Sequence, residues 1–448
     1  MRILIVTPEF PPHSGGGILK YYALLSDALA QAGASVTVLV ATPFSAYDNY
    51  TTRDNVSVRF VPLADVEQQA ARLSHLSAAP TYRRYIAAAL AAAAVVRATA
   101  DHYDRIETTD FGLLFAPLVT LTNRPPVAVT LHGSIGQISE HEPANPATAL
   151  DDALARLTEA TLLPAADALH AYSPMNAAEW TARLKANVVM QFPPLAVPPI
   201  HPRHSSEFSG LVAARIQAWK GPIELCEAVK AMGTGIADDF RIAWAGRDTR
   251  SAPDGGSLSQ WLTSHYPDIW GTRIVPIGPQ PPATIATLQS SVRYVVIPSK
   301  WDTFNYTLAE SMAARCVTLG SQSAGAAALI DEGTNGFTID VSDAKQFADR
   351  LAHVHALTEQ ARAAIGDAAR QTIVRQLDPS VVASGWLSFL STLSPQAPPP
   401  HVAEWVRQFL DPPSSPHAGE AFLENVSIKR LASHLGQRLV RKASATRS

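Results

Sequence analysis

Two basic side chains stand five positions apart in the segment Ala214–Gly221, directly after a short apolar run. Arg215 and Lys220 are suited to a diphosphate, because guanidinium and ammonium groups form charge-assisted hydrogen bonds with phosphate oxygens. The chain has eight lysines against 28 arginines, so the lysine beside Gly221 stands out. A solvated loop with ordinary surface charge would carry the same residues, and the segment alone leaves both interpretations open.

Two carboxylates stand eight positions apart in the segment Pro298–Ala313, which reads PSKWDTFNYTLAESMA. A helix is predicted to begin near Tyr306, so that the preceding loop amides point out of a helix N-terminus. Glu310 is suited to the hydroxyls of a diol such as ribose, and Asp302 to a second hydroxylated group. The alternative for Glu310 is a favourable charge near a helix start, worth about 0.3–1 kcal/mol.

Three glycines, Gly15–Gly17, lie between the first predicted strand and the first predicted helix. Glycines at such a junction let the backbone approach a ligand, and the helix N-terminus offers free N–H groups to a phosphate. The segment is not the dinucleotide fingerprint, because Lys20 stands where that pattern requires glycine. It is no P-loop either, because no Gly-Lys-Ser/Thr follows. A turn that simply needs glycine is the alternative.

His132 and Gly246 each stand at the end of a predicted strand, where open parallel sheets bind ligands. A histidine at this position can hydrogen-bond a ligand across a cleft, or its ring can be satisfied by nearby backbone groups. Both interpretations of His132 stay open. Gly246, directly after the strand predicted over Phe240–Ala245, is counted among the nucleotide-binding positions.

Short β-branched runs alternate with longer alanine- and leucine-rich stretches, which predicts βαβ units and parallel sheets covered on both faces. In the first half the predicted strands are Arg2–Thr7, Ser35–Ala41, Val56–Pro62, Val127–His132 and Ala168–Ser173. In the second half they are Gly210–Arg215, Phe240–Ala245, Arg273–Ile277, Tyr294–Pro298, Val317–Ser321 and Gly336–Asp340. The alternation therefore occurs twice and predicts two domains of similar size.

A proline-rich stretch, QFPPLAVPPIHPRHSSEFSG over Gln191–Gly210, separates the two halves and is typical of a linker. The predicted architecture is α/β, with two Rossmann-like domains facing across a cleft and a C-terminal helical extension. Its boundaries are 1–195 for the first domain, 196–209 for the linker and 210–377 for the second domain. Residues 378–393 are predicted to cross back to the first domain, and 394–448 to form a proline-rich spacer and a basic tail.

Composition excludes several classes of protein. The 448 residues carry a formal net charge of −3, which argues against a basic nucleic-acid binder, and 47% are hydrophobic, which argues against general disorder. Two cysteines, Cys226 and Cys316, cannot form a disulfide framework or a cysteine-rich zinc site, and they fit a reducing compartment. The start of the chain suits a first strand better than a signal peptide, and no apolar stretch of about 18 residues predicts a membrane span.

The net charge is unevenly distributed. The last 21 residues carry six basic residues and no acid, so the first 427 carry −9. Ile428, Leu431, Leu435 and Leu439 recur on one face of a helix. One hypothesis is an amphipathic helix over 428–442 that contacts anionic lipids at the inner face of the membrane, in an otherwise cytoplasmic protein. The alternative is a solvated tail.

Taken in order, these elements resemble the retaining glycosyltransferases of family 4, which have the GT-B fold. The resemblance covers about residues 1–393. Gly16 and Gly17 stand before Leu29, Gly33 and Val36 at the spacing of the family's first helix. Arg215 and Lys220 match its Arg-x4-Lys pair, and Pro298 to Ala313 match its Pro-Ser-x-x-Glu-x-Phe block, with seven residues between the two acids.

The resemblance implies a nucleotide diphospho-sugar donor, with UDP or GDP expected, a hydroxylated acceptor (a glycan, a lipid-linked or a small molecule), and no metal or other cofactor. Domain 1–195 would bind the acceptor and domain 210–377 the nucleotide sugar. Arg215 and Lys220 would hold the diphosphate, with amides of Gly16 and Gly17 opposite. Glu310 would hold the ribose. The donor sugar would be positioned by Asp302, by His132 and by the loop residues Phe304, Asn305 and Tyr306.

Several positions depart from the family's pattern. Asp302 replaces the first glutamate, Asn305 replaces the glycine after Phe304, and Ala328 replaces the glutamate of a later Gly-Gly-x-x-Glu segment. Two alternatives therefore stay open: a non-catalytic glycosyltransferase-like partner protein, and a nucleotide-sugar epimerase on the same fold.

Overall fold

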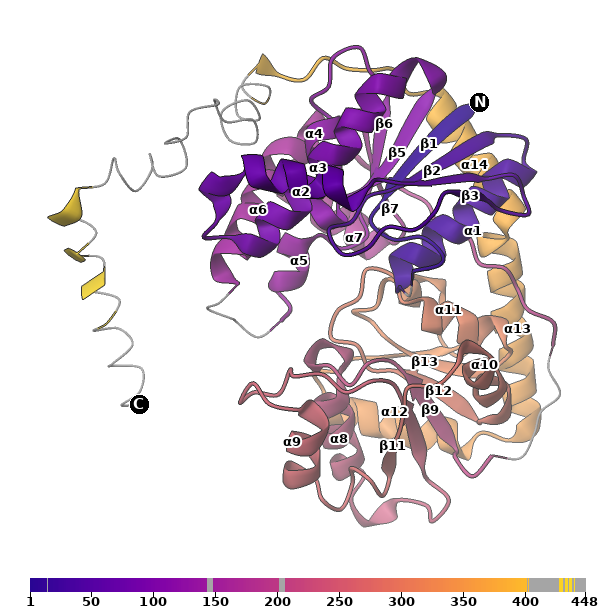
Figure 1. Ribbon diagram of the computed structural model, residues 1–448. Helices are drawn as coiled ribbons and strands as arrows, with labels where there is room; N and C mark the ends of the chain where they lie inside the picture. Colours follow the sequence, from indigo (N-terminus) through magenta and orange to yellow (C-terminus); the bar gives the residue numbers. More distant parts are fainter. Residues whose placement is uncertain are drawn as a thin grey trace.

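The computed structural model describes residues 1–13, 15–142, 148–200, 206–400 and 402, together with single positions between 427 and 439. The chain forms two α/β domains, one above the other in Figure 1, each built on its own sheet. The two parallel-sheet domains predicted from the alternation of strands and helices are confirmed.

The first domain contains an eight-stranded sheet in the order β3-β4-β2-β1-β5-β6-β7-β8. All its neighbouring strands are parallel except the pair β3 and β4. The strands are β1 Arg2–Thr7, β2 Ser35–Val40, β3 Tyr50–Thr51, β4 Ser57–Phe60, β5 Arg105–Thr109, β6 Val127–Thr130, β7 Ala168–Ala171 and β8 Val188–Met190. The carboxyl ends of β1, β5 and β6 lead into the loops that carry Gly16, Asp110 and His132.

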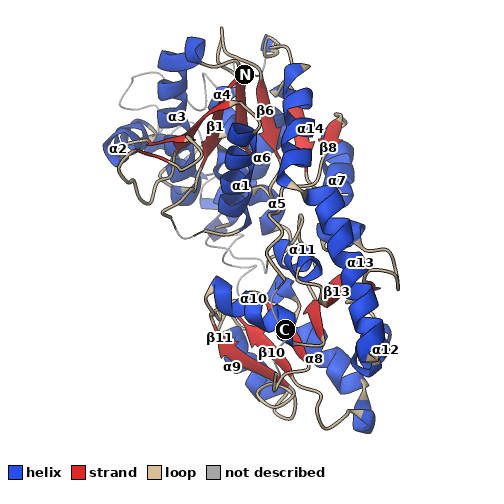
Figure 2. Cartoon of the chain, turned by 90° about the vertical axis from the view of Figure 1, so that its right-hand side faces the viewer, coloured by secondary structure: helices blue, strands red, loops and turns tan. Residues whose placement is uncertain are grey.

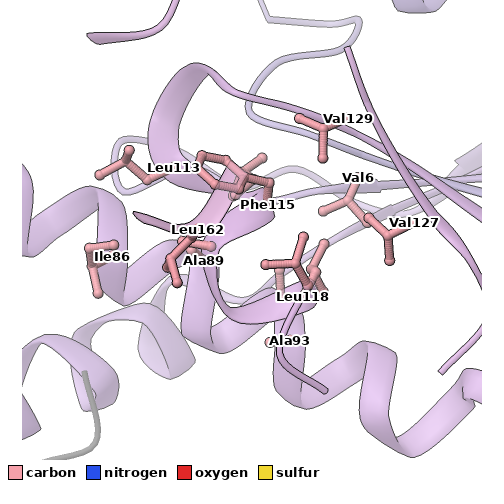
Figure 3. Packing of buried hydrophobic residues seen from close by; sticks show 14 of the residues in the cluster. Val6, Ile86, Ala89, Ala93, Leu113, Phe115, Leu118, Val127, Val129 and Leu162 are labelled. Carbon is pink, nitrogen blue, oxygen red and sulfur yellow. The ribbon is translucent and has the colours of Figure 1, made fainter. Parts of the chain in front are cut away.

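Helices cover both faces of this sheet. They are α1 Gly17–Gln31, α2 Leu63–Arg72, α3 Pro80–Thr99, α4 Phe115–Leu118, α5 Ile135–Ser139, α6 Ala149–Leu162 and α7 Pro174–Leu184. Alternate residues of β1 point to opposite faces, so Leu4 and Val6 join one core while Ile3 and Ile5 join another. Figure 3 shows the first of these cores, where Val6 packs with Ala89 and Ala93 of the alanine-rich helix α3 and with Phe115.

The second domain contains a six-stranded parallel sheet in the order β11-β10-β9-β12-β13-β14. Its strands are β9 Gly210–Ala213, β10 Ile242–Ala245, β11 Ile274–Gly278, β12 Tyr294–Ile297, β13 Val317–Ser321 and β14 Phe337–Ile339. Its helices are α8 Pro222–Ala231, α9 Leu258–His265, α10 Pro282–Ser291, α11 Tyr306–Ala313 and α12 Ala344–Ala356. The central strands β9 and β12 lead into the loops of Arg215 and Asp302.

Two helices connect the domains along one side of the molecule (Figures 1 and 2). Helix α13, Glu359–Leu377, packs on the second domain, and α14, Pro379–Ser391, lies against the first. Arg105 donates through Nε to the carbonyl of Leu390 at 2.5 Å. One hydrophobic cluster runs from α1 and β1 through α14 and α13 to α11, so the two domains share part of a core.

The sequence patterns missed β5, whose residues RIETT are too polar for a central strand. Glu107 lies in the middle of this strand and is completely buried. It persists there because it accepts hydrogen bonds from the hydroxyls of Thr130 and Tyr22, and burial raises its pKa well above the ordinary value. A buried carboxyl that is protonated and hydrogen-bonded replaces the apolar residue that a hydropathy pattern expects.

The predicted amphipathic helix over 428–442 lies mostly outside the described residues, as do 403–426. Ile428, Leu435 and Leu439, which are described, are exposed. Within the described part of the chain, no helix combines the length and apolar character needed to cross a membrane.

Trp386 anchors α14 to the first domain: it is 1% exposed, and its ring centroid lies 4.3 Å from that of His170 on β7. Trp386→Ala is therefore expected to lower the free energy of unfolding by about 3–5 kcal/mol through the cavity it leaves. Val381→Ala on the same helix is the matched control, because Val381 is 54% exposed. Urea denaturation checks this prediction, and equal small shifts for both variants would contradict it.

Candidate active site

A cavity of ≈ 680 Å³ lies between the two domains. The first domain contributes Gly15 and Lys20 from the start of α1, and the second contributes the loops after β9 and β10 and the face of α11. Of the predicted site residues, Arg215, Gly246 and Glu310 line this cavity. The linker also contributes, through Leu195 to Ile200, so the connection between the domains is itself a wall of the site.

Arg215 and Arg247 face each other across the loops after β9 and β10. Strand register pairs Ala213 with Ala245, and a bridge pairs Ile216 with Asp248, which places Arg215 opposite Arg247. Neither guanidinium makes an ion pair with another described residue, and both residues are exposed. Two neighbouring guanidinium groups repel each other and attract anions, so this pair could hold a phosphate between the two loops.

Gly246 is required by the same loops. A Cβ at this position would lie 1.8 Å from the carbonyl oxygen of Ala214, which is a severe overlap. Any larger residue would push the β9 loop, and Arg215 with it, away from the cavity.

Lys220 is held in place by its neighbours. It ends a short 3-10 helix, Ala218–Lys220, and Gly221 follows with φ +76. A Cβ at Gly221 would lie 1.7 Å from the carbonyl oxygen of Pro298, so only glycine lets the two loops meet. Lys220 Nζ forms an ion pair with Asp302 Oδ2 at 2.5 Å, with both side chains more than four-fifths buried. Lys220, predicted to bind the diphosphate, and Asp302, predicted to bind the donor sugar, are therefore ion-paired with each other in this structure.

Asn305 explains one departure from the family pattern. Its φ of 79 lies in the left-handed region, which glycine and asparagine tolerate best. Its Oδ1 accepts from the amide of Leu308 at 3.1 Å and caps α11, while its Nδ2 donates to Asp302 Oδ2 at 2.9 Å. Asparagine thus keeps the glycine-like backbone and adds a side chain that orients Asp302.

Glu310 projects from α11 into the cavity and forms an ion pair with Lys20 of α1. Lys20 also lies over the ring of Tyr306, 5.0 Å from its centroid. Gly17 stands at the same contact, because a Cβ there would lie 3.9 Å from Tyr306 Cδ2. The start of α1 therefore packs directly against the start of α11 across the domain boundary.

The amide of Gly16 is already occupied. It donates to Glu9 Oε1 at 3.3 Å, and the amide of Leu19 donates to the same oxygen at 3.0 Å. A carboxylate of the chain itself thus lies at the helix N-terminus where a phosphate was predicted. Glu9 comes from the loop directly after β1.

His132 lies beside the cavity rather than on its wall and is 6% exposed. The rings of Tyr21, Tyr22 and Tyr172 surround it, with centroids 4.8, 5.0 and 5.1 Å from its own. Burial, with a smaller contribution from His170, lowers its pKa well below the ordinary value, so the imidazole is neutral. Nδ1 lies 3.0 Å from the Tyr172 hydroxyl, and Nε2 makes no hydrogen bond with any described residue.

The loop of Asp302 also connects to the first domain. Ser173 Oγ donates to the carbonyl of Thr303 at 2.6 Å, and Thr303 Oγ1 donates to the carbonyl of His132 at 3.0 Å. The amide of His132 donates to Asp110 Oδ1 at 2.8 Å. Burial raises the pKa of Asp110 to about 7, so this carboxyl holds the His132 backbone while titrating near neutrality. Phe304, next in the loop, is buried and packs against Tyr172 at 5.8 Å between centroids.

Three residues of the site were missed by the sequence patterns: Lys20, Glu9 and Arg247. Lys20 had a usable signal, because a lysine one turn into a glycine-led helix lies beside the amides that bind an anion. Arg247 also had a usable signal, because it directly follows Gly246 at the end of a predicted strand. Glu9 gave no local signal. Across the described ranges, no group of three His, Cys, Asp or Glu side chains converges in a way that could hold a metal ion.

Comparison with known families identifies both halves of the chain. The family described as "Glycosyl transferase 4-like domain" matches residues 16–222, and the one described as "Glycosyl transferases group 1" matches residues 208–356. The two matches follow each other in the order of the two domains. No curated protein sequence matches the chain significantly.

Several solved structures share the two-domain fold. Sucrose-phosphate synthase from Thermosynechococcus elongatus has 17% identity and a TM-score of 0.67, over 87% of this chain and 98% of its own. Anabaena HepE, in complex with UDP and glucose, has 17% identity and a TM-score of 0.61, over 87% and 99%.

The α,α-trehalose-phosphate synthase (UDP-forming) from Burkholderia xenovorans, in complex with glucose-6-phosphate, has 16% identity and a TM-score of 0.62, over 87% and 100%. At these identities the likeness establishes the fold, and the two family matches establish the class of enzyme. The chain is therefore a glycosyltransferase of GT-B architecture, which joins a glycosyl transferase 4-like domain to a group 1 domain.

Proposed function

We propose that the protein transfers a sugar from a nucleotide diphospho-sugar to a hydroxylated acceptor, with retention of anomeric configuration and without a metal ion. The observation that carries the proposal is the cavity between the domains, which is lined both by the guanidinium-bearing Arg215 and by the carboxylate-bearing Glu310. A nucleoside diphosphate has complementary groups, because its phosphates attract a cation and its ribose hydroxyls donate to a carboxylate.

The cations act on the leaving group. Arg215 is not ion-paired within the described residues, and Lys220 stands in the same loop, so both can offset the charge that develops on the departing diphosphate. Arg247 adds a second guanidinium opposite Arg215. Protein cations then supply the electrostatic stabilisation that a divalent ion would otherwise supply.

The bond changes balance within the substrates. The acceptor oxygen forms a bond to the anomeric carbon on the face from which the diphosphate departs, and the bond from that carbon to the phosphate oxygen breaks. The acceptor proton passes to the leaving phosphate. Asp302, oriented by Lys220 and Asn305, would hold hydroxyls of the donor sugar. His132 is neutral and its Nε2 is unpaired among the described residues, so it can donate or accept but carries no charge to the site.

The structural relatives support the choice of donor. The Anabaena protein is in complex with UDP and glucose, and the Burkholderia enzyme is described as UDP-forming. A uridine or guanosine diphospho-sugar is therefore the first donor to test. Incubation with UDP- and GDP-sugars and a panel of hydroxylated acceptors should release the nucleoside diphosphate, and NMR of the product should show the donor's anomeric configuration. An inverted product would contradict retention, and isomerised donor without released nucleotide would indicate an epimerase.

Lys220→Ala is expected to lower kcat by roughly 10²–10³, because it removes a charge that acts on the leaving diphosphate. Lys300→Ala is the matched control: Lys300 lies two residues from Asp302, but its side chain is 53% exposed and its ammonium pairs with Glu224. Thermal midpoints of both variants, measured alongside steady-state rates, separate catalysis from folding. Wild-type turnover by Lys220→Ala would remove Lys220 from the site.

Glu310→Ala is expected to raise the Kd of the nucleoside diphosphate roughly tenfold or more, since hydrogen bonds to a charged group contribute about 1.5–3 kcal/mol. Inorganic pyrophosphate has no ribose, so its Kd should not rise. Calorimetric titration of both ligands makes the comparison, with Glu207→Ala as the control because Glu207 is exposed and does not line the cavity. A parallel loss of pyrophosphate binding would contradict the ribose role.

A further inference from the structure

A second cavity, of ≈ 670 Å³, lies within the first domain and has no role in donor binding as argued above. It is bounded by the start of α3, the turn after β5, and helices α5 and α6. We call it the α5–α6 pocket. Its volume is in the range of small-molecule sites, which are commonly clefts of about 300–1,000 Å³.

The α5–α6 pocket opens beside the leaving-group cations. Phe111 and Ile135 line it and follow β5 and β6, so it lies at the carboxyl edge of the sheet, where the first domain faces the second. Glu142, on its rim, accepts from Gln217 Nε2 at 2.9 Å. Gln217 lies between Arg215 and Lys220, so a ligand in the pocket borders the loop that holds the donor diphosphate.

One wall of the pocket is aromatic and aliphatic. The rings of Tyr85 and Phe111 stand edge to face with centroids 6.0 Å apart, and Phe44 extends the row, 6.0 Å from Tyr85. Phe44 is 63% exposed, so its ring is accessible beside the pocket. Ile138 continues this wall from α5. Such a surface suits the apolar face of a sugar ring.

The pocket also contains carboxylates. Among the described residues that line it, Glu142, Asp151 and Asp152 are acidic and Arg156 alone is basic, and the Arg156 guanidinium donates to Ser139 Oγ at 2.7 Å. Asp151 Oδ1 accepts from the amide of Tyr82 at 2.7 Å, and Asp152 Oδ2 accepts from Thr148 Oγ1 at 3.0 Å. Within the described part of the chain, each aspartate thus has its second oxygen left to accept from a ligand. Carboxylate oxygens accept hydrogen bonds from hydroxyls and repel phosphates.

From this arrangement we infer that the α5–α6 pocket binds the acceptor, and that the acceptor presents an unphosphorylated, polyhydroxylated sugar ring. The inference rests on the proposed function, since that function supplies the transfer of a sugar. The kind of acceptor is inferred from the chemistry of the pocket. It separates this protein from the trehalose-phosphate synthase with the same fold, whose structure contains glucose-6-phosphate. Three carboxylates around one arginine exclude such a dianion, whereas they fit the hydroxyls of a neutral ring.

Direct binding tests the pocket without turnover. Saturation-transfer NMR on the full chain would compare methyl hexopyranosides of gluco, galacto and manno configuration with the matching hexose 6-phosphates. We expect at least one methyl hexopyranoside to bind, and to bind at least tenfold more tightly than its 6-phosphate. Tighter binding of the phosphates, or binding of none of the sugars, would overturn the inference.

Two variants locate the binding site. Asp152→Asn and Tyr85→Ala should each raise the Kd of the bound methyl hexopyranoside by roughly tenfold, the size expected for one lost charged hydrogen bond or one lost ring contact. Asp152→Arg should invert the preference and favour the 6-phosphate. Asp349→Asn, an exposed carboxylate of the second domain, is the control. Unchanged sugar affinity in Asp152→Asn and Tyr85→Ala, with thermal midpoints like the wild type, would place the sugar elsewhere and refute the assignment.

The same samples distinguish this inference from the proposed function. If UDP and GDP fail to bind while a methyl hexopyranoside binds in the α5–α6 pocket, the donor proposal fails and the pocket stands. If the nucleotides bind and only sugar phosphates compete for transfer, the donor proposal stands and the acceptor inference fails.

Discussion

The site depends on the contact that Thr303 makes across the domain boundary. Its carbonyl accepts from Ser173 and its hydroxyl donates to the carbonyl of His132, so one residue of the second domain is hydrogen-bonded to two strand ends of the first. Thr303 is flanked by Asp302 and Phe304, so the contact determines where the loop that we propose to bind the donor sugar lies. The groups on the two domains can act on one substrate only while this contact keeps the domains in their present relative position.

Hydrophobic packing stabilises the same relative position of the two domains. The hydrophobic cluster that includes β1, α1 and α14 continues through α13 to α11, and therefore to the helix that carries Glu310. The ion pair between Lys20 and Glu310 lies at the surface of this shared core. The ion pair at the domain boundary thus lies next to buried apolar surface, and the burial of that surface contributes more to stability than the ion pair does. Residues of the linker also line the cavity between the domains.

Much of this could be predicted from the sequence, because local patterns carried it. Alternating apolar runs indicated both sheets, and the helix predicted to begin near Tyr306 does begin there, as α11, because Asn305 caps it. What could not be predicted depends on residues far apart in the chain. Glu107 is tolerated in β5 only because Tyr22 and Thr130 reach it, and the partner of Glu310 is a lysine 290 positions away. Neither contact has a periodicity that a sequence pattern can detect.

Glu9 bears on how the proposed site would capture a phosphate. Its carboxylate accepts from the amides of Gly16 and Leu19, so the chain's own side chain satisfies the N-terminus of α1. In the proposed function, a phosphate would reach these amides only by displacing Glu9, and the cost of that displacement would lower its apparent affinity. The returning carboxylate would then compete with the product diphosphate after transfer. A side chain that weakens capture of the donor would in this way also hasten release of the product.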